Sequence, residues 1–97
     1  MAQVWDWAPK DPDEIKRYWH DWTNYLGEGE TISSVTCILD KGTVEVLQGN
    51  DITPGNLQPV KLSGGVDGEF CRLTLRATID EGDQIYETGI HIRIQSK

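Results

Sequence analysis

The stretch EFCRLTLRATID, residues 69–80, decides the fold, because apolar side chains occupy every second position along it. The side chains on one face are all small or apolar: Cys71, Leu73, Leu75, Ala77 and Ile79. The side chains on the opposite face are mostly polar: Phe70, Arg72, Thr74, Arg76 and Thr78. Alternation over a full strand length predicts a β-strand with one buried face and one solvated face.

The sequence that follows this strand predicts its antiparallel partner. Residues 81–84, EGDQ, contain the Gly and Asp that favour tight turns. The next run alternates again and places a mainly apolar set of side chains on one side: Tyr86, Thr88, Ile90, Ile92 and Ile94. We therefore expect a long hairpin at the C-terminal end of the sequence.

Shorter alternating runs lie upstream of this hairpin. Residues 32–39 and 43–47 alternate on either side of a turn, and residues 60–62 predict a short strand. Residues 48–59 are rich in Gly, Asn and Pro and predict a long loop or an irregular edge, since proline removes a donor from a β-ladder. Several short strands separated by turn residues predict an all-β fold, namely a β-sandwich.

The segment from Asp11 to Leu26 fits either a helix or a strand. The helical interpretation places Asp11 at the N-cap and Pro12 at the first helical position, with one apolar face: Ile15, Trp19, Trp22 and Leu26. The strand interpretation alternates two sets of residues of strand-favouring type: Tyr18, His20 and Trp22 against Trp19 and Asp21. The residues alone leave these two interpretations nearly equal, and a short helical turn near residues 12–16 is compatible with both.

Length and charge exclude several classes of function. The chain has 97 residues, enough for one domain, and its 16 acidic and 9 basic residues give a formal net charge of −7. Nucleic-acid binding needs clustered Lys and Arg, and no such cluster is present. The longest apolar run is Cys37–Leu39, far short of the roughly 20 residues that cross a bilayer, so we expect no membrane association. The first ten residues lack the features of a secretory signal, so synthesis in a cytoplasm is expected.

No pattern in the sequence predicts catalysis, a cofactor or a metal site. Nucleophilic catalysis needs a Ser, Cys or Thr beside a base, and the only histidines are His20 and His91. The acidic turns at residues 11–14 and 80–83 do not match a calcium loop, and turns commonly carry acids for backbone reasons. We therefore expect a non-enzymatic protein.

The two cysteines allow two interpretations. Cys71 occupies a core-facing position and Cys37 is expected to do the same, so both could point into the sandwich from facing sheets and form a disulfide. The alternative is a pair of reduced core thiols, which a cytoplasmic context favours.

The N-terminal segment carries the candidate partner contacts. Trp5 and Trp7 stand among polar residues near the terminus, where each packs either on the domain or on a neighbouring protein. We predict an N-terminal arm at residues 1–10 and a single β-sandwich domain at residues 11–97. The arm is the candidate anchor, with Trp5, Trp7 and Lys10 as its partner-binding residues.

Four stretches, in order along the chain, resemble a family of small structural proteins from tailed phages and prophages. They are WAPKDPDEI (7–15), YWHDWTNYL (18–26), GETISS (29–34) and LSGG (62–65), the last followed by Gly68. Proteins of this family are described as virion structural or fibre-like. The resemblance implies an immunoglobulin-like antiparallel β-sandwich, favours the strand interpretation of residues 11–26, and implies no catalytic residues.

These expectations combine into a functional prediction. The chain is expected to be a virion structural protein, an accessory or decoration component of the capsid or head–tail region. It would contact capsid or connector subunits and be homo-oligomeric or lattice-bound. The alternative is a carbohydrate-binding or adhesin-type module of a phage fibre, which predicts exposed, coplanar aromatic rings. A weaker alternative is an intracellular regulator whose acidic face mimics nucleic acid.

Overall fold

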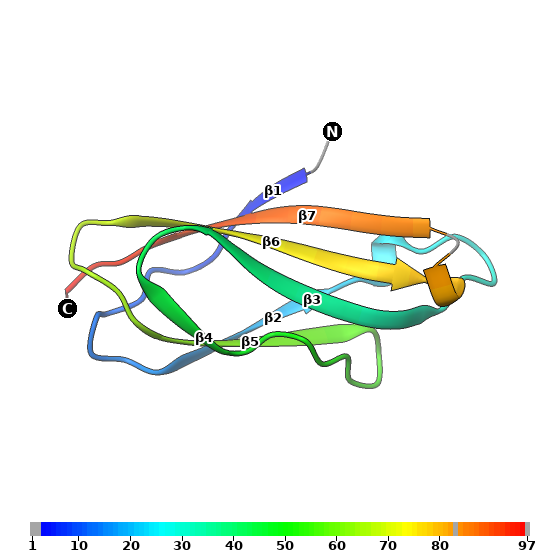
Figure 1. The fold of residues 1–97 in the computed structure, drawn as a ribbon, viewed down its shortest axis with the longest axis horizontal. Coiled ribbons are helices and arrows are strands. Elements are labelled where there is room, and N and C mark those ends of the chain that lie inside the picture. The colour runs from blue at the N-terminus through cyan, green and yellow to red at the C-terminus, as the bar shows by residue number, and fades with distance from the viewer. Residues whose placement is uncertain (1–2, 83, 97) are drawn as a thin grey trace.

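The computed structural model describes residues 3–82 and 84–96, and within them the chain is an all-β sandwich, as predicted (Figure 1). The strands are β1 (Gln3–Asp6), β2 (Lys16–Asp21), β3 (Ile32–Lys41), β4 (Val44–Gln48), β5 (Leu57–Gly64), β6 (Phe70–Ile79) and β7 (Gln84–Arg93). Two short 3₁₀ turns are η1 (Thr23–Tyr25) and η2 (Asp80–Gly82). In the described residues no helix is long and apolar enough to cross a membrane.

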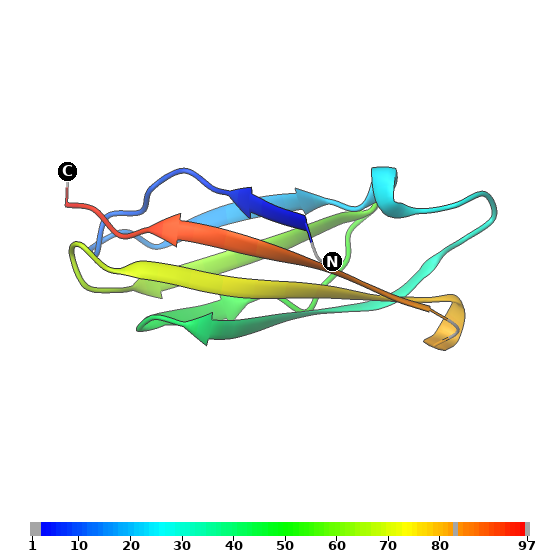
Figure 2. The same cartoon turned by 90° about the horizontal axis from the view of Figure 1, so that it is seen from above.

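The strands form two sheets with the orders β1-β7-β6-β3 and β2-β5-β4. All pairings are antiparallel except that of β1 with β7, which is parallel. The sets β3-β6-β7 and β2-β5-β4 follow the order of the C-F-G and B-E-D strands of an immunoglobulin sandwich, with β1 added beside β7. The strands run along the 43 Å long axis, and their connections gather at its two ends (Figure 2).

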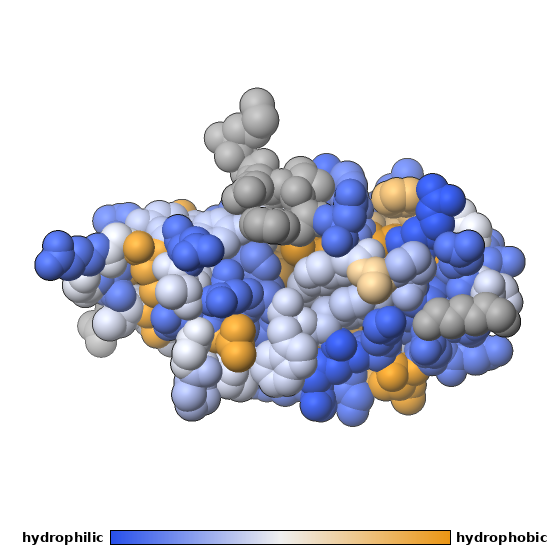
Figure 3. Space-filling view, turned by 180° about the vertical axis from the view of Figure 1, so that it is seen from behind, coloured by the Kyte–Doolittle hydropathy of each residue, from blue (hydrophilic) through white to orange (hydrophobic). Residues whose placement is uncertain are grey.

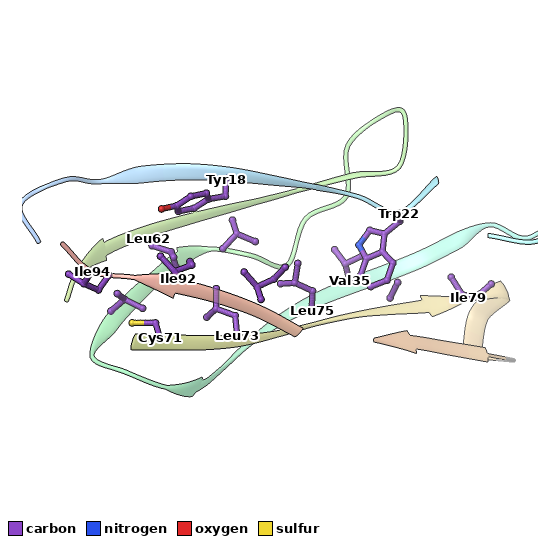
Figure 4. Packing of buried hydrophobic residues seen from close by; sticks show 14 residues of the cluster. Tyr18, Trp22, Val35, Leu62, Cys71, Leu73, Leu75, Ile79, Ile92 and Ile94 are labelled. Carbon is purple, nitrogen blue, oxygen red and sulfur yellow. The ribbon is translucent and has the colours of Figure 1, made fainter. Parts of the chain in front are cut away.

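The core lies between the sheets and is built from their inward-facing side chains (Figure 4). The predicted hairpin is confirmed as β6 and β7, and the apolar faces predicted for both strands are buried except at Tyr86, which is partly buried. The β2-β5-β4 sheet covers them with a second buried set: Tyr18, Val44, Val60 and Leu62. At roughly 25 cal/mol per Å² of buried apolar surface, this contact is the main stabilising term of the fold.

The ambiguous segment forms the strand β2 from Lys16 onward, and no helix precedes it near residues 12–16 in the described structure. A single turn forms instead, in which the Glu14 amide donates to the Asp11 carbonyl at 3.0 Å and the Asp13 amide donates to Asp11 Oδ1 at 2.8 Å. These are the capping contacts that also begin a helix, but the chain leaves the turn at Ile15, which is 64% exposed, and continues as an extended strand. Alternation from Lys16 onward buries one side of β2.

The segment 48–59, predicted as a long loop or an irregular edge, is a loop only in its first part, because β5 begins at Leu57 and includes Pro59. Pro59 lies opposite Trp19 of β2, whereas β4 pairs with β5 only as far as Lys61. At Pro59 the strand therefore has a partner on one side, which is the edge position that proline tolerates.

The segment predicted as an N-terminal arm belongs to the sandwich. Residues Gln3–Asp6 form β1 and pair with Thr88 to His91 of β7. Farther along, Lys10 forms a parallel bridge with Ile94. The backbone of this segment is thus an edge of the larger sheet.

Candidate partner interface

Lys10, predicted to contact a partner, is fully buried, so that prediction is wrong. Its Nζ donates to the carbonyl of Asp11 at 2.8 Å and to the carbonyl of Gly64 at 2.7 Å. Burial lowers the pKa of Lys10 from its ordinary value, although Glu14 and Asp11 oppose that shift. This ammonium group joins the turn after residue 10 to the end of β5, and it has no surface left for a partner.

The two N-terminal tryptophans have different outcomes. The ring of Trp7 is partly buried and stacks on Tyr18, with centroids 4.6 Å apart and planes at 12°. The Tyr18 hydroxyl donates to the Ala8 carbonyl at 2.7 Å, and burial raises the pKa of Tyr18 to about 12. Trp7 therefore already packs on its own domain. The backbone of Trp5 pairs with Ile90, and its side chain lies outside the described part of the structure.

Cys37 and Cys71 are both free thiols, so the disulfide interpretation is wrong. An immunoglobulin bridge joins the second and sixth strands of facing sheets, but these cysteines lie on β3 and β6, which are neighbours in one sheet. Cys37 is opposite Leu75, four residues along β6 from Cys71, a separation of roughly 13 Å that exceeds disulfide reach. Burial raises the pKa of Cys37 to about 12 and also raises that of Cys71, which makes both thiols poor nucleophiles.

The polar groups inside the sandwich are structural. Gln58 is fully buried on β5; it accepts a hydrogen bond from Trp22 Nε1 at 2.8 Å and donates to the carbonyls of Thr36 and Gly49 at 3.1 and 2.7 Å. Through Gln58 of β5, these contacts connect β3 of the larger sheet with the residues that directly follow β2 and β4 of the other sheet. In the described residues no group of three or more His, Cys, Asp or Glu side chains is arranged to hold a metal ion.

His20 is a buried ionisable group enclosed by aromatic rings. Its ring meets Trp22 and Tyr25 edge-on, with centroids 4.7 and 5.4 Å away. Burial lowers the pKa of His20 to about 4, against the opposing charge of Asp21. The imidazole is therefore neutral at pH 7, and it packs among aromatic rings as a core group.

The lowered pKa of His20 predicts that the free energy of unfolding decreases as the pH is lowered. The folded pKa is about 4 and the unfolded value is 6.5, so the unfolded chain binds the extra proton first as the pH drops. Stability from this group is complete above pH 6.5 and is lost between pH 6.5 and 4, by about 2 kcal/mol from pH 7 to pH 5. Urea unfolding of the wild type and of His20→Phe at each pH measures it.

The difference between these two proteins isolates His20 from the carboxylates that titrate in the same range. We expect the wild type to lose stability relative to His20→Phe as the pH falls from 7 to 5. Parallel profiles for the two proteins would contradict the burial of a neutral imidazole.

The two outer sheet faces differ in how their charges are arranged. On the larger sheet two arginines have acidic partners: Arg76 lies 2.5 Å from Glu87 across β6 and β7, and Arg72 lies 3.9 Å from Asp40. On the β2-β5-β4 sheet, Arg17 lies directly opposite Lys61, and neither side chain has a hydrogen bond or ion pair within the described structure. The unpaired cations mark this second face as the candidate interface.

The same face carries the exposed tryptophan of the described chain. Trp19 is 50% exposed and lies opposite Pro59, in the row next to Arg17 and Lys61. Leu47, 45% exposed, lies in the bulge of β4. Seen from behind the view of Figure 1, the surface in Figure 3 shows separate apolar spots among hydrophilic residues. The strand interpretation already placed Trp19 on the side opposite Tyr18 and Trp22, but the pairing of two cations across strands has no local signal in the sequence.

This fold and its surfaces define a small β-sandwich module whose buried polar groups serve structure and whose outer faces are available for protein contact. A family model described as "Gp77: Podophage GP4 fiber-tail adaptor protein gp77" matches residues 10–93. The chain belongs to this family, and it is therefore a bacteriophage virion structural protein of the tail region. Comparison with curated proteins gives no match.

Proposed function

We propose that this chain is a non-enzymatic adaptor that joins a fibre to the phage tail through protein–protein contacts. The observation that carries the proposal is the family match, which runs from Lys10 to Arg93 and so covers both sheets except β1. The match thus concerns the sandwich as a whole.

The internal roles of the family-resembling stretches support an adaptor that works through its outer surface. Lys10 of the first stretch donates to Gly64 of the last stretch, and Trp22 of the second donates to Gln58. The backbone amide of Thr31, in the third stretch, donates a hydrogen bond to Asp80 Oδ1 at 2.9 Å. Because these residues hold the fold together, recognition falls to side chains that point outward.

The carbohydrate-binding alternative has less support. A sugar platform needs exposed coplanar rings, but Trp7 and Tyr18 stack on each other and Trp22 is fully buried. Among the aromatic side chains described, Trp19 and Phe70 are exposed, and they lie on opposite sheets. The other candidate location in the virion is the capsid surface, and deletion of the gene distinguishes capsid decoration from a role at the tail.

Deleting the gene for this chain from its phage tests the proposal. We expect particles with filled capsids and assembled tails that lack fibres, together with loss of adsorption, both restored by the wild-type chain supplied in trans. Negative-stain electron microscopy counts fibres per tail. Deletion particles with a normal number of fibres would overturn the adaptor function, and recovery of the chain on isolated capsids would favour decoration instead.

A further inference from the structure

We infer that the outer face of the β2-β5-β4 sheet, centred on Arg17, Lys61 and Trp19, binds an acidic surface of a partner virion protein. This inference rests on the proposed adaptor function and names one of its two attachment surfaces. We call these three residues the cation–tryptophan face.

The first argument is the arrangement of the two cations. Arg17 and Lys61 are register partners on antiparallel strands, and both point outward, because their neighbours Tyr18, Val60 and Leu62 are buried. Side chains in such positions start about 5 Å apart, and like charges placed there destabilise the sheet. The free chain thus keeps an unfavourable pair that an anionic partner would relieve.

The second argument is that this pair has no acidic partner among the described residues. The other cation pair across strands, Lys41 opposite Arg72, has Asp40 3.9 Å from Arg72. Of the remaining described cations, Lys10 is buried, Arg76 pairs with Glu87, and Lys16 and Arg93 lie over the rings of Tyr18 and Phe70. The nearest acids on the same face, Asp21 and Glu45, form no ion pair with Arg17 or Lys61.

The third argument is the apolar surface beside the cations. Trp19 exposes half of its surface, while Pro59 opposite it is buried, and Leu47 lies across the sheet on β4. Tryptophan and arginine are the residues most enriched among those that dominate interface energies. An Arg guanidinium binds carboxylates through two parallel hydrogen bonds, so a segment containing Asp or Glu fits this face.

Other occupants fit less well. Nucleic acid would meet two cations on a strongly acidic protein, too few to offset the repulsion. A second copy that bound symmetrically through this face would bring its own Arg17 and Lys61 against this pair, and the four cations would repel one another. A partner protein with unused acids is the better match.

The isolated chain provides the first test. Replacing Lys61 with glutamate puts opposite charges across β2 and β5, so we expect the thermal midpoint to rise by about 2–4 °C at low salt. Arg93→Glu, at the exposed end of β7 opposite Phe70, makes the same change in net charge on the other sheet. A midpoint for Lys61→Glu that falls below that of Arg93→Glu would overturn the claim that the cation pair is unfavourable in the free chain.

The second test uses phage particles that lack the chain and are complemented in trans. We expect Arg17→Glu/Lys61→Glu and Trp19→Ala to be incorporated into tails at about one tenth of the wild-type level or less, measured by quantitative mass spectrometry. The matched control Lys41→Glu/Arg93→Glu changes the charge equally on the other sheet and is expected to incorporate normally. Wild-type incorporation of Arg17→Glu/Lys61→Glu would overturn the inference.

Two readouts separate this inference from the proposed function. Incorporation of the chain reports on the cation–tryptophan face, whereas fibre number reports on the adaptor function. If the double variant is not incorporated but particles without the chain keep their fibres, the face is supported and the adaptor function fails. If the wild type is a dimer in solution and only the double variant is a monomer, the occupant is a second copy, and the choice of a partner protein is overturned.

Discussion

Replacing Gln58 with leucine is expected to lower the free energy of unfolding by about 3–5 kcal/mol, because three hydrogen-bonding groups lose their partner at once. Trp22 Nε1 would keep no acceptor at 2.8 Å, and the carbonyls of Thr36 and Gly49 would lose their donor. The leucine side chain has a similar volume, so little of the loss would come from a cavity. Urea unfolding monitored by tryptophan fluorescence measures the change directly.

The matched control for this substitution is Gln95→Leu. Gln95 is exposed after β7, so its replacement is expected to change stability by less than about 0.5 kcal/mol. Equal stability of the two variants would mean that Gln58 does not connect the sheets as its contacts indicate.

Replacing Lys10 with methionine is expected to lower the free energy of unfolding by about 2–3 kcal/mol. Methionine fills the same space, but the carbonyls of Asp11 and Gly64 lose a charged donor at 2.8 and 2.7 Å. In the wild type, the two hydrogen bonds of the Lys10 ammonium group stabilise the fold, but its desolvation, which also lowers its pKa, offsets part of that stabilisation. The loss in Lys10→Met is therefore smaller than the full strength of two charged hydrogen bonds.

Lys41→Met is the control, because Lys41 is exposed at the end of β3. We expect it to stay within about 0.5 kcal/mol of the wild type. If Lys10→Met were as stable as Lys41→Met, the buried ammonium group would not hold the N-terminal turn to the end of β5. Lys10 would then again be a candidate for partner contact.

The β-sandwich could be predicted because, in most strands, the alternation of polar and apolar residues shows which face is buried. In β6 and β7 each side chain is polar or apolar according to the face it occupies, so the hairpin follows from local alternation alone. The start of β5 could not be predicted, because Pro59 normally excludes a paired strand and is tolerated only where β4 has ended. The capping contacts of Asp11 are the same in one turn and in a helix, so burial farther along the chain decided between them.

The candidate site was harder to predict than the fold. Lysine is usually exposed, and the burial of Lys10 depends on a carbonyl 54 residues away. The disulfide interpretation placed the cysteines on facing sheets, but their strands are neighbours, which only the sheet order reveals. The opposition of Arg17 and Lys61 likewise depends on the register between β2 and β5. Long-range pairing, which has no local pattern, is what the sequence left undetermined.

A cryo-electron microscopy reconstruction of the intact tail with its fibres tests the central claim most directly. We expect density for this sandwich at the fibre attachment point, with Trp19, Arg17 and Lys61 against an acidic segment of a neighbouring protein and a different surface in contact with the second partner. A chain located on the capsid shell, or at the fibre junction with the cation–tryptophan face open to solvent, would contradict this account.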